Sequence, residues 1–194
     1  MLLDLGIGNI ANVKKALDAN ISDDIYEIER AEKIVLPGVG NFGSVSKTLE
    51  PLKGCINDSI QEGKPFLGIC LGMHLLFEKS EESKGISLEF LKGKVLGFRD
   101  VPAPHIGWNQ IYPEKNCKLL QDIEKGEFFY YVHSYYVDPV DDDIISATTE
   151  YEHKNDEVQF PAVVSKENLY GVQFHPEKSS KSGLRMMKNF KEVV

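Results

Sequence analysis

A strand that runs directly into a glycine-flanked cysteine is the feature of this sequence that most constrains its fold. The apolar segment 65–69 is followed at once by a second apolar segment, 71–77. We interpret the first as a buried strand and the second as a helix, with the pentapeptide Gly-Ile-Cys-Leu-Gly at 68–72 as the turn between them. Glycine permits the tight bend and close packing that such a turn needs.

The remaining elements predict an α/β fold. In the first half, short apolar runs alternate with helical patterns, which predicts a parallel sheet with helices on both faces. In the second half, closely spaced strands predict additional antiparallel pairing. Strands are expected at 2–5, 33–36, 65–69, 94–98, 128–132, 144–149, 162–166 and 169–173. Helices are expected at 10–17 (capped by Asn9), 44–52, 55–62, 71–77 and 183–193.

Composition excludes several classes of protein. The 194 residues are 42% hydrophobic and 27% charged, which predicts one folded domain over 1–194. The formal charge of −8 disfavours nucleic-acid binding through the overall field. Cys55, Cys70 and Cys117 are too few and too widely spaced for a disulfide framework or a zinc site. Because no segment reads as a signal peptide or a membrane span, we expect a cytoplasmic protein without membrane contact.

Cys70 is the candidate nucleophile. The turn places it at the carboxyl end of the sheet, where open α/β sheets hold their sites, and at a helix start, where the dipole favours a thiolate. A thiol with a pKa near 8.5 is about 3% ionised at pH 7, and a pKa of about 6 ionises roughly 90%. That change needs about 3.4 kcal/mol, whereas a helix end supplies about 1 kcal/mol. We therefore expect a histidine partner, unless Cys70 is a structural cysteine packed between glycines.

His175 and Glu177 are the candidates for that partner. Pro176 biases His175 toward extended backbone, in which residues two apart project from the same side. The Glu177 carboxylate can then lie behind the imidazole, fix its tautomer and stabilise its protonated form. With Cys70 they form a candidate Cys-His-Glu set for nucleophilic catalysis. The alternative is a strand end with a packing histidine and a solvated glutamate.

A second turn, Pro-Gly-Val-Gly at 37–40, follows a strand and precedes a helix. Its two glycines free the backbone to aim N–H groups at an anion. The N–H groups of Val39, Gly40 and Leu71 are therefore candidates for an oxyanion hole, in which one donor is typically worth about 10²–10³ in turnover. Taken alone, the motif is weak, because most Pro-Gly turns are only turns.

Six motifs in chain order carry a resemblance to a known family. They lie at 4–9 (Asp-Leu-Gly-Ile-Gly-Asn), 36–42 (Leu-Pro-Gly-Val-Gly-Asn-Phe), 68–73, 104–109 (Pro-His-Ile-Gly-Trp-Asn), 131–136 (Tyr-Val-His-Ser-Tyr-Tyr) and 171–179. With them the chain resembles the class I, triad-type glutamine amidotransferases over essentially its whole length. The motif at 104–109 and Lys178 are most similar to members that serve imidazole glycerol phosphate synthase. The resemblance implies the family's fold, an open, mostly parallel, flavodoxin-like sheet.

The resemblance also implies a reaction. Cys70 would attack the side-chain amide of L-glutamine, His175 would carry the proton to the leaving ammonia, and Glu177 would orient His175. Water would then release glutamate from a glutamyl thioester. Ammonia would pass to a separate (β/α)8-barrel cyclase subunit, which makes imidazole glycerol phosphate and aminoimidazole carboxamide ribotide in histidine biosynthesis. No metal and no organic cofactor are implied.

Further positions carry over from the family's motifs. Residues expected to bind the substrate are Gly38, Gly40, His74, His133, Ser134 and Tyr135. Residues expected to face the partner are Asn9, His105, Trp108, Asn109 and Lys178. The oxyanion strand at 38–39 is expected to become aligned when the partner binds its own substrate.

The sequence departs from the family's pattern at two places. The family usually has glutamine where this chain has His74, and that glutamine helps to hold the substrate. Histidine donates one hydrogen bond, but its charge depends on pH. The segment 151–160 replaces a short Tyr-Gly turn, and we expect it to form a solvated loop.

Three other functions remain open at this stage. The chain could serve another synthase, such as anthranilate synthase or a sugar-pathway relative; Trp108 and Lys178 argue mainly against the first. It could be a binding subunit that lost turnover, which His74 suggests and the intact Cys-His-Glu set opposes. A cysteine peptidase on a similar sheet would leave the motif at 175–178 unexplained.

Overall fold

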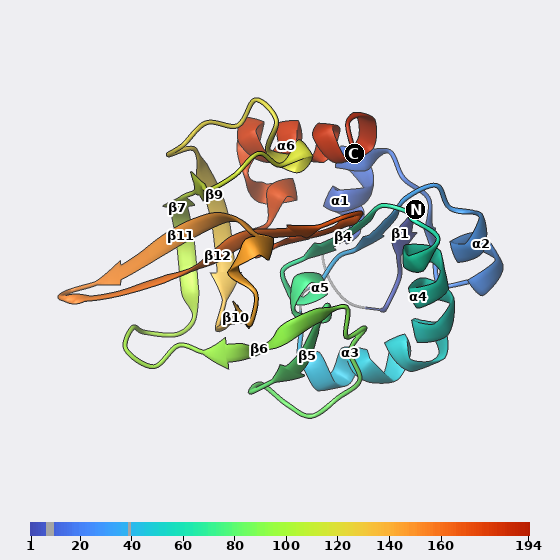
Figure 1. Ribbon diagram of the computed structural model, residues 1–194, viewed down its shortest axis with the longest axis horizontal. Coiled ribbons are helices and arrows are strands. Elements are labelled where there is room, and N and C mark those ends of the chain that lie inside the picture. The colour runs from blue at the N-terminus through green and yellow to red at the C-terminus, as the bar shows by residue number, and fades with distance from the viewer. Residues whose placement is uncertain (7–9, 39) are drawn as a thin grey trace.

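A mostly parallel sheet lies between two layers of helices in the computed structural model, which describes residues 1–6, 10–38 and 40–194 (Figure 1). The helices are α1 (Ile10–Leu17), α2 (Ile25–Arg30), α3 (Phe42–Leu49), α4 (Lys53–Gln61), α5 (Leu71–His74) and α6 (Ser180–Glu192). Single 3-10 turns are η1 (Glu50–Leu52), η2 (Lys118–Leu120), η3 (Asp142–Ile144) and η4 (Pro176–Lys178). Within these ranges no helix has both the length and the apolar character that crossing a membrane requires.

The strands divide among three sheets. They are β1 (Leu2–Leu3), β2 (Ile21–Ser22), β3 (Ile34–Leu36), β4 (Phe66–Ile69), β5 (Phe77–Ser80), β6 (Leu91–Gly97), β7 (His105–Gln110), β8 (Tyr112–Pro113), β9 (Phe128–His133), β10 (Tyr135–Pro139), β11 (Ile145–His153), β12 (Asp156–Lys166) and β13 (Leu169–Val172). Among the described residues, the largest sheet has the order β2-β1-β3-β4-β13-β12-β11-β8. A second sheet has the order β10-β6-β5, and β7 pairs with β9.

The largest sheet confirms the predicted fold class. The strands β2, β1, β3, β4 and β13 pair in parallel, and β12, β11 and β8 continue the sheet in antiparallel fashion. The parallel part has the 2-1-3-4-5 order of flavodoxin-like folds. In that topology, sites form outside the carboxyl ends of the strands, and Cys70 follows β4 at that edge.

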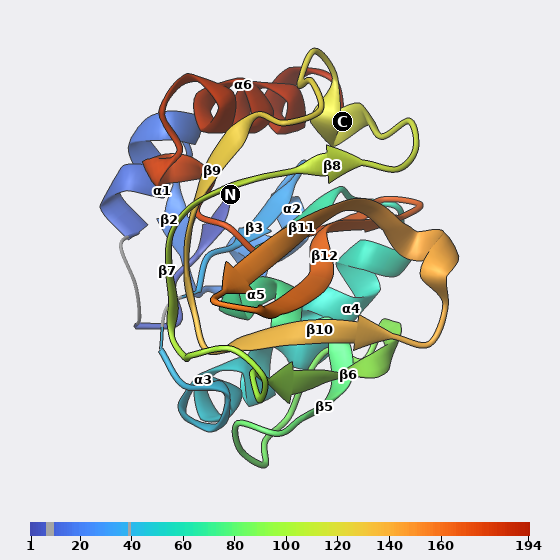
Figure 2. The ribbon, with the colours of Figure 1, turned by 90° about the vertical axis from the view of Figure 1, so that its left-hand side faces the viewer.

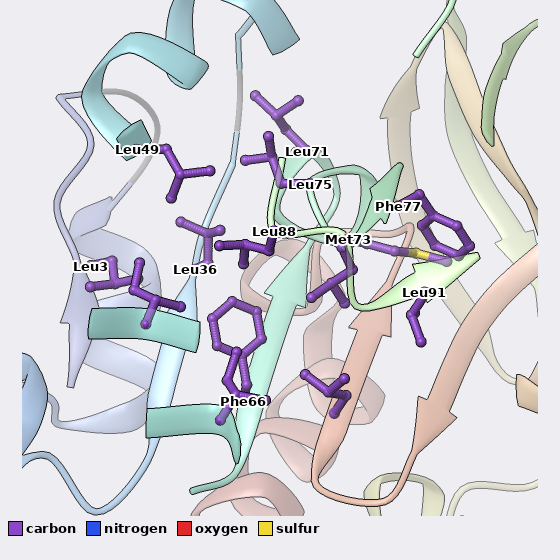
Figure 3. Close-up of a cluster of buried hydrophobic side chains, with 14 of the residues drawn as sticks. Leu3, Leu36, Leu49, Phe66, Leu71, Met73, Leu75, Phe77, Leu88 and Leu91 are labelled. Atoms are coloured by element: carbon purple, nitrogen blue, oxygen red, sulfur yellow. The ribbon is translucent and has the colours of Figure 1, made fainter. Parts of the chain in front are cut away.

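Alternating strand residues supply two hydrophobic cores, one on each face of the sheet. Leu3 and Phe66 belong to a buried cluster with residues of α3 and α4. Their neighbours Leu2 and Leu67 belong to a second cluster with residues of α1 and α6. Figure 3 shows the first cluster, in which Leu71 of α5 joins the strand residues. Burial on both faces explains why these strands are continuous apolar runs rather than alternating patterns.

The antiparallel half extends beyond the helical layers. The hairpin of β11 and β12 projects to one end of the molecule, at the left of Figure 1. Seen from that end, β7 and β9 run side by side across the molecule (Figure 2). The turn from β9 into β10 contains Ser134 and brings both strands to the edge of the sheet where β4 ends.

Asn41 fixes the start of the helix predicted at 44–52. Its Oδ1 accepts hydrogen bonds from the N–H groups of Gly43 at 3.0 Å and Ser44 at 3.3 Å. A capping side chain satisfies donors that the first turn of a helix leaves free. The helix therefore begins at Phe42, directly after the glycine turn. The predicted cap of the first helix, Asn9, lies outside the described residues.

The structure corrects two predicted segments. The helix expected over 71–77 ends at His74, and Phe77 instead begins β5, where it pairs with Leu91 of β6. The segment 151–160, expected to be a loop, forms the facing arms of the β11–β12 hairpin. Residues 152–157 are nevertheless exposed, so that part of the prediction is confirmed.

Candidate active site

The backbone bends sharply at Cys70, between β4 and α5. Cys70 has φ 52° and ψ −106°, a left-handed φ that strains a non-glycine residue. A Cβ at Gly68 would lie 2.4 Å from the carbonyl oxygen of Gly72, and one at Gly72 would lie 2.0 Å from that of Leu36. The two flanking glycines are thus needed for close backbone packing. The Cys70 N–H donates to the Val172 carbonyl at 2.7 Å, which ties the turn to β13.

His175 and Glu177 form a buried pair beside this turn. His175 Nδ1 lies 2.8 Å from Glu177 Oε1, and both side chains are 2% exposed. The backbone holds His175 in place, because its N–H donates to the Tyr130 carbonyl at 2.8 Å and its own carbonyl accepts from Ser179 Oγ at 2.6 Å. The predicted pair forms, but by a different backbone geometry: His175 has extended backbone, whereas Glu177 lies in the 3-10 turn η4, which carries its carboxylate to the imidazole.

The charge of His175 follows from its neighbours. Burial lowers the pKa of its imidazole, but the adjoining Cys70 side chain and the Glu177 carboxylate outweigh burial and raise that pKa to about 10. Its Nε2 is buried and makes no well-directed hydrogen bond within the described residues. A protonated imidazole between a thiolate and a carboxylate can hold a proton and later release it.

The helix after Cys70 is too short to act as predicted. α5 is a single turn of four residues, so its dipole contributes less than a full helix end would. The sulfur has another polar neighbour, because the Gln173 amide nitrogen donates to Cys70 Sγ at 3.7 Å. The Gln173 amide oxygen lies 3.0 Å from His74 Nε2. His74 thus contacts another side chain where the family resemblance predicts a substrate contact.

A cavity of about 290 Å³ opens beside Cys70. Five of the six predicted substrate-binding residues line it, namely Gly40, His74, His133, Ser134 and Tyr135. The remaining lining residues are Cys70, Leu71, Glu82, Pro104 and Val132. A larger hollow of about 560 Å³ lies at the opposite edge of the sheet, and the described residues that line it include no cysteine, serine, threonine or histidine.

The two turns that were predicted to supply oxyanion donors lie against each other. A Cβ at Gly38 would lie 2.6 Å from the Leu71 Cβ and 2.7 Å from the Gly72 nitrogen. Leu71 opens α5, where the helix itself offers its N–H no acceptor. Gly40 has φ 124° and lines the cavity. The predicted donor Val39 lies outside the described residues.

Two buried histidines connect the cavity to β7. His133 Nδ1 lies 2.8 Å from the Tyr135 carbonyl, and its Nε2 lies 3.1 Å from His105 Nδ1. Because the carbonyl only accepts, His133 donates from Nδ1 and accepts from His105 at Nε2. Burial lowers the pKa of His105 to about 4 and holds the pKa of His133 well below its usual value. Both rings are therefore neutral at pH 7.

The predicted partner-facing residues divide into exposed and buried ones. Trp108 is 47% exposed on β7, and Lys178 is exposed with its Nζ 5.8 Å from the centre of the Tyr130 ring. Asn109 is half-buried and donates to the Glu150 carbonyl. His105 is only 1% exposed, so its side chain lies beneath the surface rather than on it. Asn9 lies outside the described residues.

The sequence prediction missed two polar residues of the site. Glu82 lines the cavity, and its Oε2 accepts from the Phe42 N–H at 2.8 Å. Glu82 lies in the polar run 78–84, a pattern typical of a solvated turn, so nothing in the sequence assigned it to the site. Gln173 is fully buried next to Cys70 and lies within the motif at 171–179. Its signal was present, since Gln173 and His175 project from the same side of an extended segment.

The β11–β12 hairpin carries a cluster of three glutamates. Oxygens of Glu150, Glu152 and Glu157 lie within 4.8 Å of one another. Exposed carboxylates gather in this way without a metal, and none of these residues lines the cavity beside Cys70. No metal ligand set therefore adjoins the nucleophile within the described residues.

The chain is similar to known proteins over nearly its whole length. Residues 8–193 match the family described as Glutamine amidotransferase class-I. The Pyrococcus furiosus protein named imidazole glycerol phosphate synthase subunit HisH is 57% identical over 99% of this chain and 97% of its own. The Methanocaldococcus jannaschii protein of that name is 44% identical over 100% and 98%. The solved structure of PurLQS from Thermotoga maritima shares the fold, with TM-score 0.76 and 19% identity over 99% of this chain and 96% of that one.

Proposed function

The chain belongs to the class I glutamine amidotransferase family, and from this premise we propose that it is the glutaminase subunit of an imidazole glycerol phosphate synthase. It hydrolyses L-glutamine to glutamate and ammonia for histidine biosynthesis. The observation that carries the proposal is the strained, buried Cys70 beside the His175–Glu177 pair at a small cavity. Nucleophilic catalysis by a thiolate requires this combination of a nucleophile, a base and a group that orients the base.

In the resting site His175 holds the proton on Nε2, so Cys70 is available as the thiolate. The thiolate attacks the carbon of the substrate side-chain amide, and the oxygen of that amide becomes an oxyanion. His175 then donates its proton to the leaving nitrogen, so that ammonia departs and a glutamyl thioester forms. For the second half, the now neutral His175 takes a proton from water, the hydroxide attacks the thioester, and glutamate leaves as the Cys70 thiolate and the protonated His175 are restored. Glu177 holds the His175 tautomer throughout.

Backbone N–H groups stabilise the oxyanion. Leu71 offers one donor at the start of α5. Gly38 packs against Leu71, and Gly40 lines the cavity beside Cys70, which supports Gly40 as a second donor. Val39 is proposed as a further donor from the sequence motif alone. Such donors act where charge develops in the transition state, which makes their alignment decisive for rate. We propose that this alignment is completed when the partner subunit binds its own substrate.

The cavity also fits the amino-acid end of glutamine. Glu82 supplies a carboxylate for the substrate ammonium group, because opposite charges attract strongly in a confined site. The Ser134 and Tyr135 backbone at the turn after β9 offers N–H groups to the substrate carboxylate. His133 and His74 border the same space as neutral rings.

The partner is a (β/α)8-barrel cyclase subunit, and the exposed strand β7 is its docking surface. Ile106 and Trp108 are 59% and 47% exposed there, and Lys178 lies next to the ring of Tyr130. Exposed aromatic residues are enriched among those that dominate binding energy at interfaces. The net charge of −8 fits a subunit that leaves phosphate binding to its partner.

The alternatives find less support. A sugar-pathway amidotransferase would share the Cys70 site, but the two relatives above carry the name of the histidine-pathway subunit. A non-catalytic binding subunit does not explain why a histidine of raised pKa adjoins a strained thiol. We propose that residues 1–194 act as one domain in the cytoplasm, a reducing setting that suits the free thiols of Cys55, Cys70 and Cys117.

Glutamate release tests the function. Glutamine is supplied to the chain alone, with a histidine-pathway cyclase subunit, and with that subunit and its ribonucleotide ligand. Strong activation by the full mixture, and its loss in Cys70→Ser, is the expected result. Activation that requires a different synthase subunit would assign the chain to that synthase, and fast hydrolysis by the chain alone would remove the proposed alignment step. A Trp108→Ala variant should weaken the complex by about 2 kcal/mol while it folds normally.

A further inference from the structure

Three buried side chains form a hydrogen-bonded row that ends at the nucleophile. His74 Nε2 lies 3.0 Å from Gln173 Oε1, and Gln173 Nε2 donates to Cys70 Sγ at 3.7 Å. We propose that His74 is a positioning residue, which holds the Gln173 amide with its NH2 group toward the sulfur and so stabilises the Cys70 thiolate. The inference deepens the proposed function and rests on it, because it concerns the same nucleophile.

The backbone gives this row little freedom to rearrange. His74 lies on α5, four residues after Cys70, and its N–H donates to the Cys70 carbonyl at 3.1 Å. The Gln173 N–H donates to the Ala162 carbonyl at 2.9 Å. Gln173 is fully buried and His74 is 4% exposed, so the Gln173 amide makes its hydrogen bonds to protein groups rather than to water. The orientation of the amide is therefore decided by its two side-chain neighbours.

Two orientations of the Gln173 amide are chemically consistent. In the first, a protonated His74 Nε2 donates to the amide oxygen, and the amide NH2 faces the sulfur. In the second, the amide donates to an unprotonated His74 Nε2, and its oxygen accepts from the thiol. A thiolate can accept but cannot donate, so only the first orientation suits the ionised nucleophile. Protonation of His74 at Nε2 therefore indicates a site arranged for the Cys70 thiolate, and protonation at Nδ1 indicates a site arranged for the thiol.

The neutrality of His74 is part of this role. Burial lowers the pKa of His74 to about 4, so the ring carries one proton at pH 7. A neutral donor orients the amide without placing a second positive charge near His175. A glutamine at this position can also donate one N–H to the Gln173 oxygen, which explains how histidine replaces the residue usual in the family.

The sulfur has other titratable neighbours, which must stay constant in a test. His175, backed by Glu177, adjoins it from the segment after β13. His133 from β9 and Glu82 from the loop after β5 border the same cavity. Variants of His74 and Gln173 leave these four side chains in the chain. A change in the pKa of the thiol can then be assigned to the row.

The pKa of Cys70 can be measured from the pH dependence of its alkylation by iodoacetamide, followed on the Cys70 peptide by mass spectrometry. We expect His74→Leu and Gln173→Leu each to raise this pKa by about one unit, because a hydrogen bond to the charged form is lost. The double variant should match either single variant, and His74→Gln should restore the original pKa. His153→Leu, which removes an exposed histidine of the β11–β12 hairpin, should leave the pKa unchanged.

Two outcomes of this experiment would overturn the proposal. One is an unchanged thiol pKa in His74→Leu beside a raised pKa in Gln173→Leu, which would show that the amide needs no orientation by His74. The other is a double variant whose shift equals the sum of the two single shifts, which would show that the residues act independently.

A second measurement uses the unsubstituted chain and does not depend on how the variants fold. Nitrogen-15 NMR at pH 7 should show His74 protonated at Nε2, and protonation at Nδ1 would overturn the proposal. Neither measurement requires glutamine turnover. Loss of the proposed function would appear as missing glutamate release with the row intact, whereas loss of this inference would leave glutamate release in place.

Discussion

Two buried pairs of side chains, His175 with Glu177 and His105 with His133, hold histidines in opposite protonation states. His175 and His105 are each 1% exposed, yet the pKa of His175 is raised to about 10 and that of His105 is lowered to about 4. His175 has a carboxylate on one side and a thiol on the other, whereas His105 has the neutral His133 ring. Burial disfavours a charged imidazole in both places, and only an anionic partner reverses the effect.

The contrast indicates different roles for the two pairs. The charged pair can store and transfer a proton, which suits it to chemistry. The neutral pair is enclosed by aromatic rings, with Tyr151 and Tyr131 stacked on His105 at 4.1 Å and 5.0 Å between ring centres. It links the cavity-lining turn at Tyr135 to the exposed strand β7 through fixed hydrogen bonds. The same residue type is thus suited to proton transfer in one region and to a structural role in the other.

The largest effect should follow from removal of the Glu177 carboxylate, which is present in the His175 pair and has no counterpart in the His105–His133 pair. Glu177→Gln removes the anion and permits the wrong tautomer of His175, so we expect kcat for glutamate release in the assembled enzyme to fall by about 10³–10⁴. The pH profile should lose the limb that depends on a charged His175. Glu192→Gln, an exposed carboxylate on α6, is the matched control and should retain full activity. A loss of less than tenfold in Glu177→Gln would contradict the assigned role.

Stability should depend on pH in opposite directions for the two regions. Between about pH 6.5 and 4, His105 binds a proton in the unfolded chain but stays neutral in the folded chain. The free energy of unfolding therefore falls on acidification, by up to about 1.4 kcal/mol per pH unit for this residue. His175 stabilises the fold below about pH 6.5, and its contribution is lost as pH rises through about 10. Urea unfolding at several pH values checks both limbs. His105→Leu should reduce the acid slope alone, and an unchanged slope would count against a neutral His105.

A smaller effect should show that the neutral pair acts as a unit. His105→Leu or His133→Leu leaves a buried polar nitrogen without its partner, and we expect each to lower the free energy of unfolding by about 1–3 kcal/mol. The double variant should cost about 1 kcal/mol less than the sum. Chemical denaturation of the four proteins completes the cycle. Simple additivity would mean that the hydrogen bond between the rings contributes nothing.

The smallest effect should come from the ring stacked on His105. Tyr151→Leu keeps an apolar side chain but removes the aromatic contact, and we expect a loss of about 1 kcal/mol in the free energy of unfolding. The pKa of Cys70 measured by alkylation should not change. A change there would show that the two regions are coupled, which the structure does not predict.

Local sequence signals predicted the nucleophile turn and the His-Glu pair. The turn could be predicted because glycines at 68 and 72 are required by backbone contacts, and such contacts act over a few residues. The pairing of His175 with Glu177 was predicted from an extended segment, but the chain turns into η4 at Pro176, and this turn brings the carboxylate to the imidazole. The parallel pairing in the first half of the chain could be predicted from the alternation of apolar runs and helical patterns, whereas the flavodoxin-like order was expected only from the family resemblance.

Tertiary contacts decided what the sequence could not show. The apolar run 71–77 fits a helix and a strand equally well, and pairing of Phe77 with Leu91 ends the helix after one turn. The polar arms of 151–160 became strands because they pair with each other along the hairpin. Strand β7 escaped prediction because it has exposed Ile106 and Trp108 with a glycine between them at φ 153°. No sequence pattern marks Glu82 as a site residue, and only the structure places it beside the cavity.

Nitrogen-15 NMR of His175 between pH 6 and 9 tests the central claim most directly. The central claim is that Glu177 and Cys70 keep this buried imidazole protonated while the other pair stays neutral. We predict that both ring nitrogens of His175 remain protonated across this range in the unsubstituted chain and that Glu177→Gln lowers the pH at which the ring loses its charge. A His175 ring that is neutral throughout, or that behaves identically with and without the carboxylate, would contradict the account.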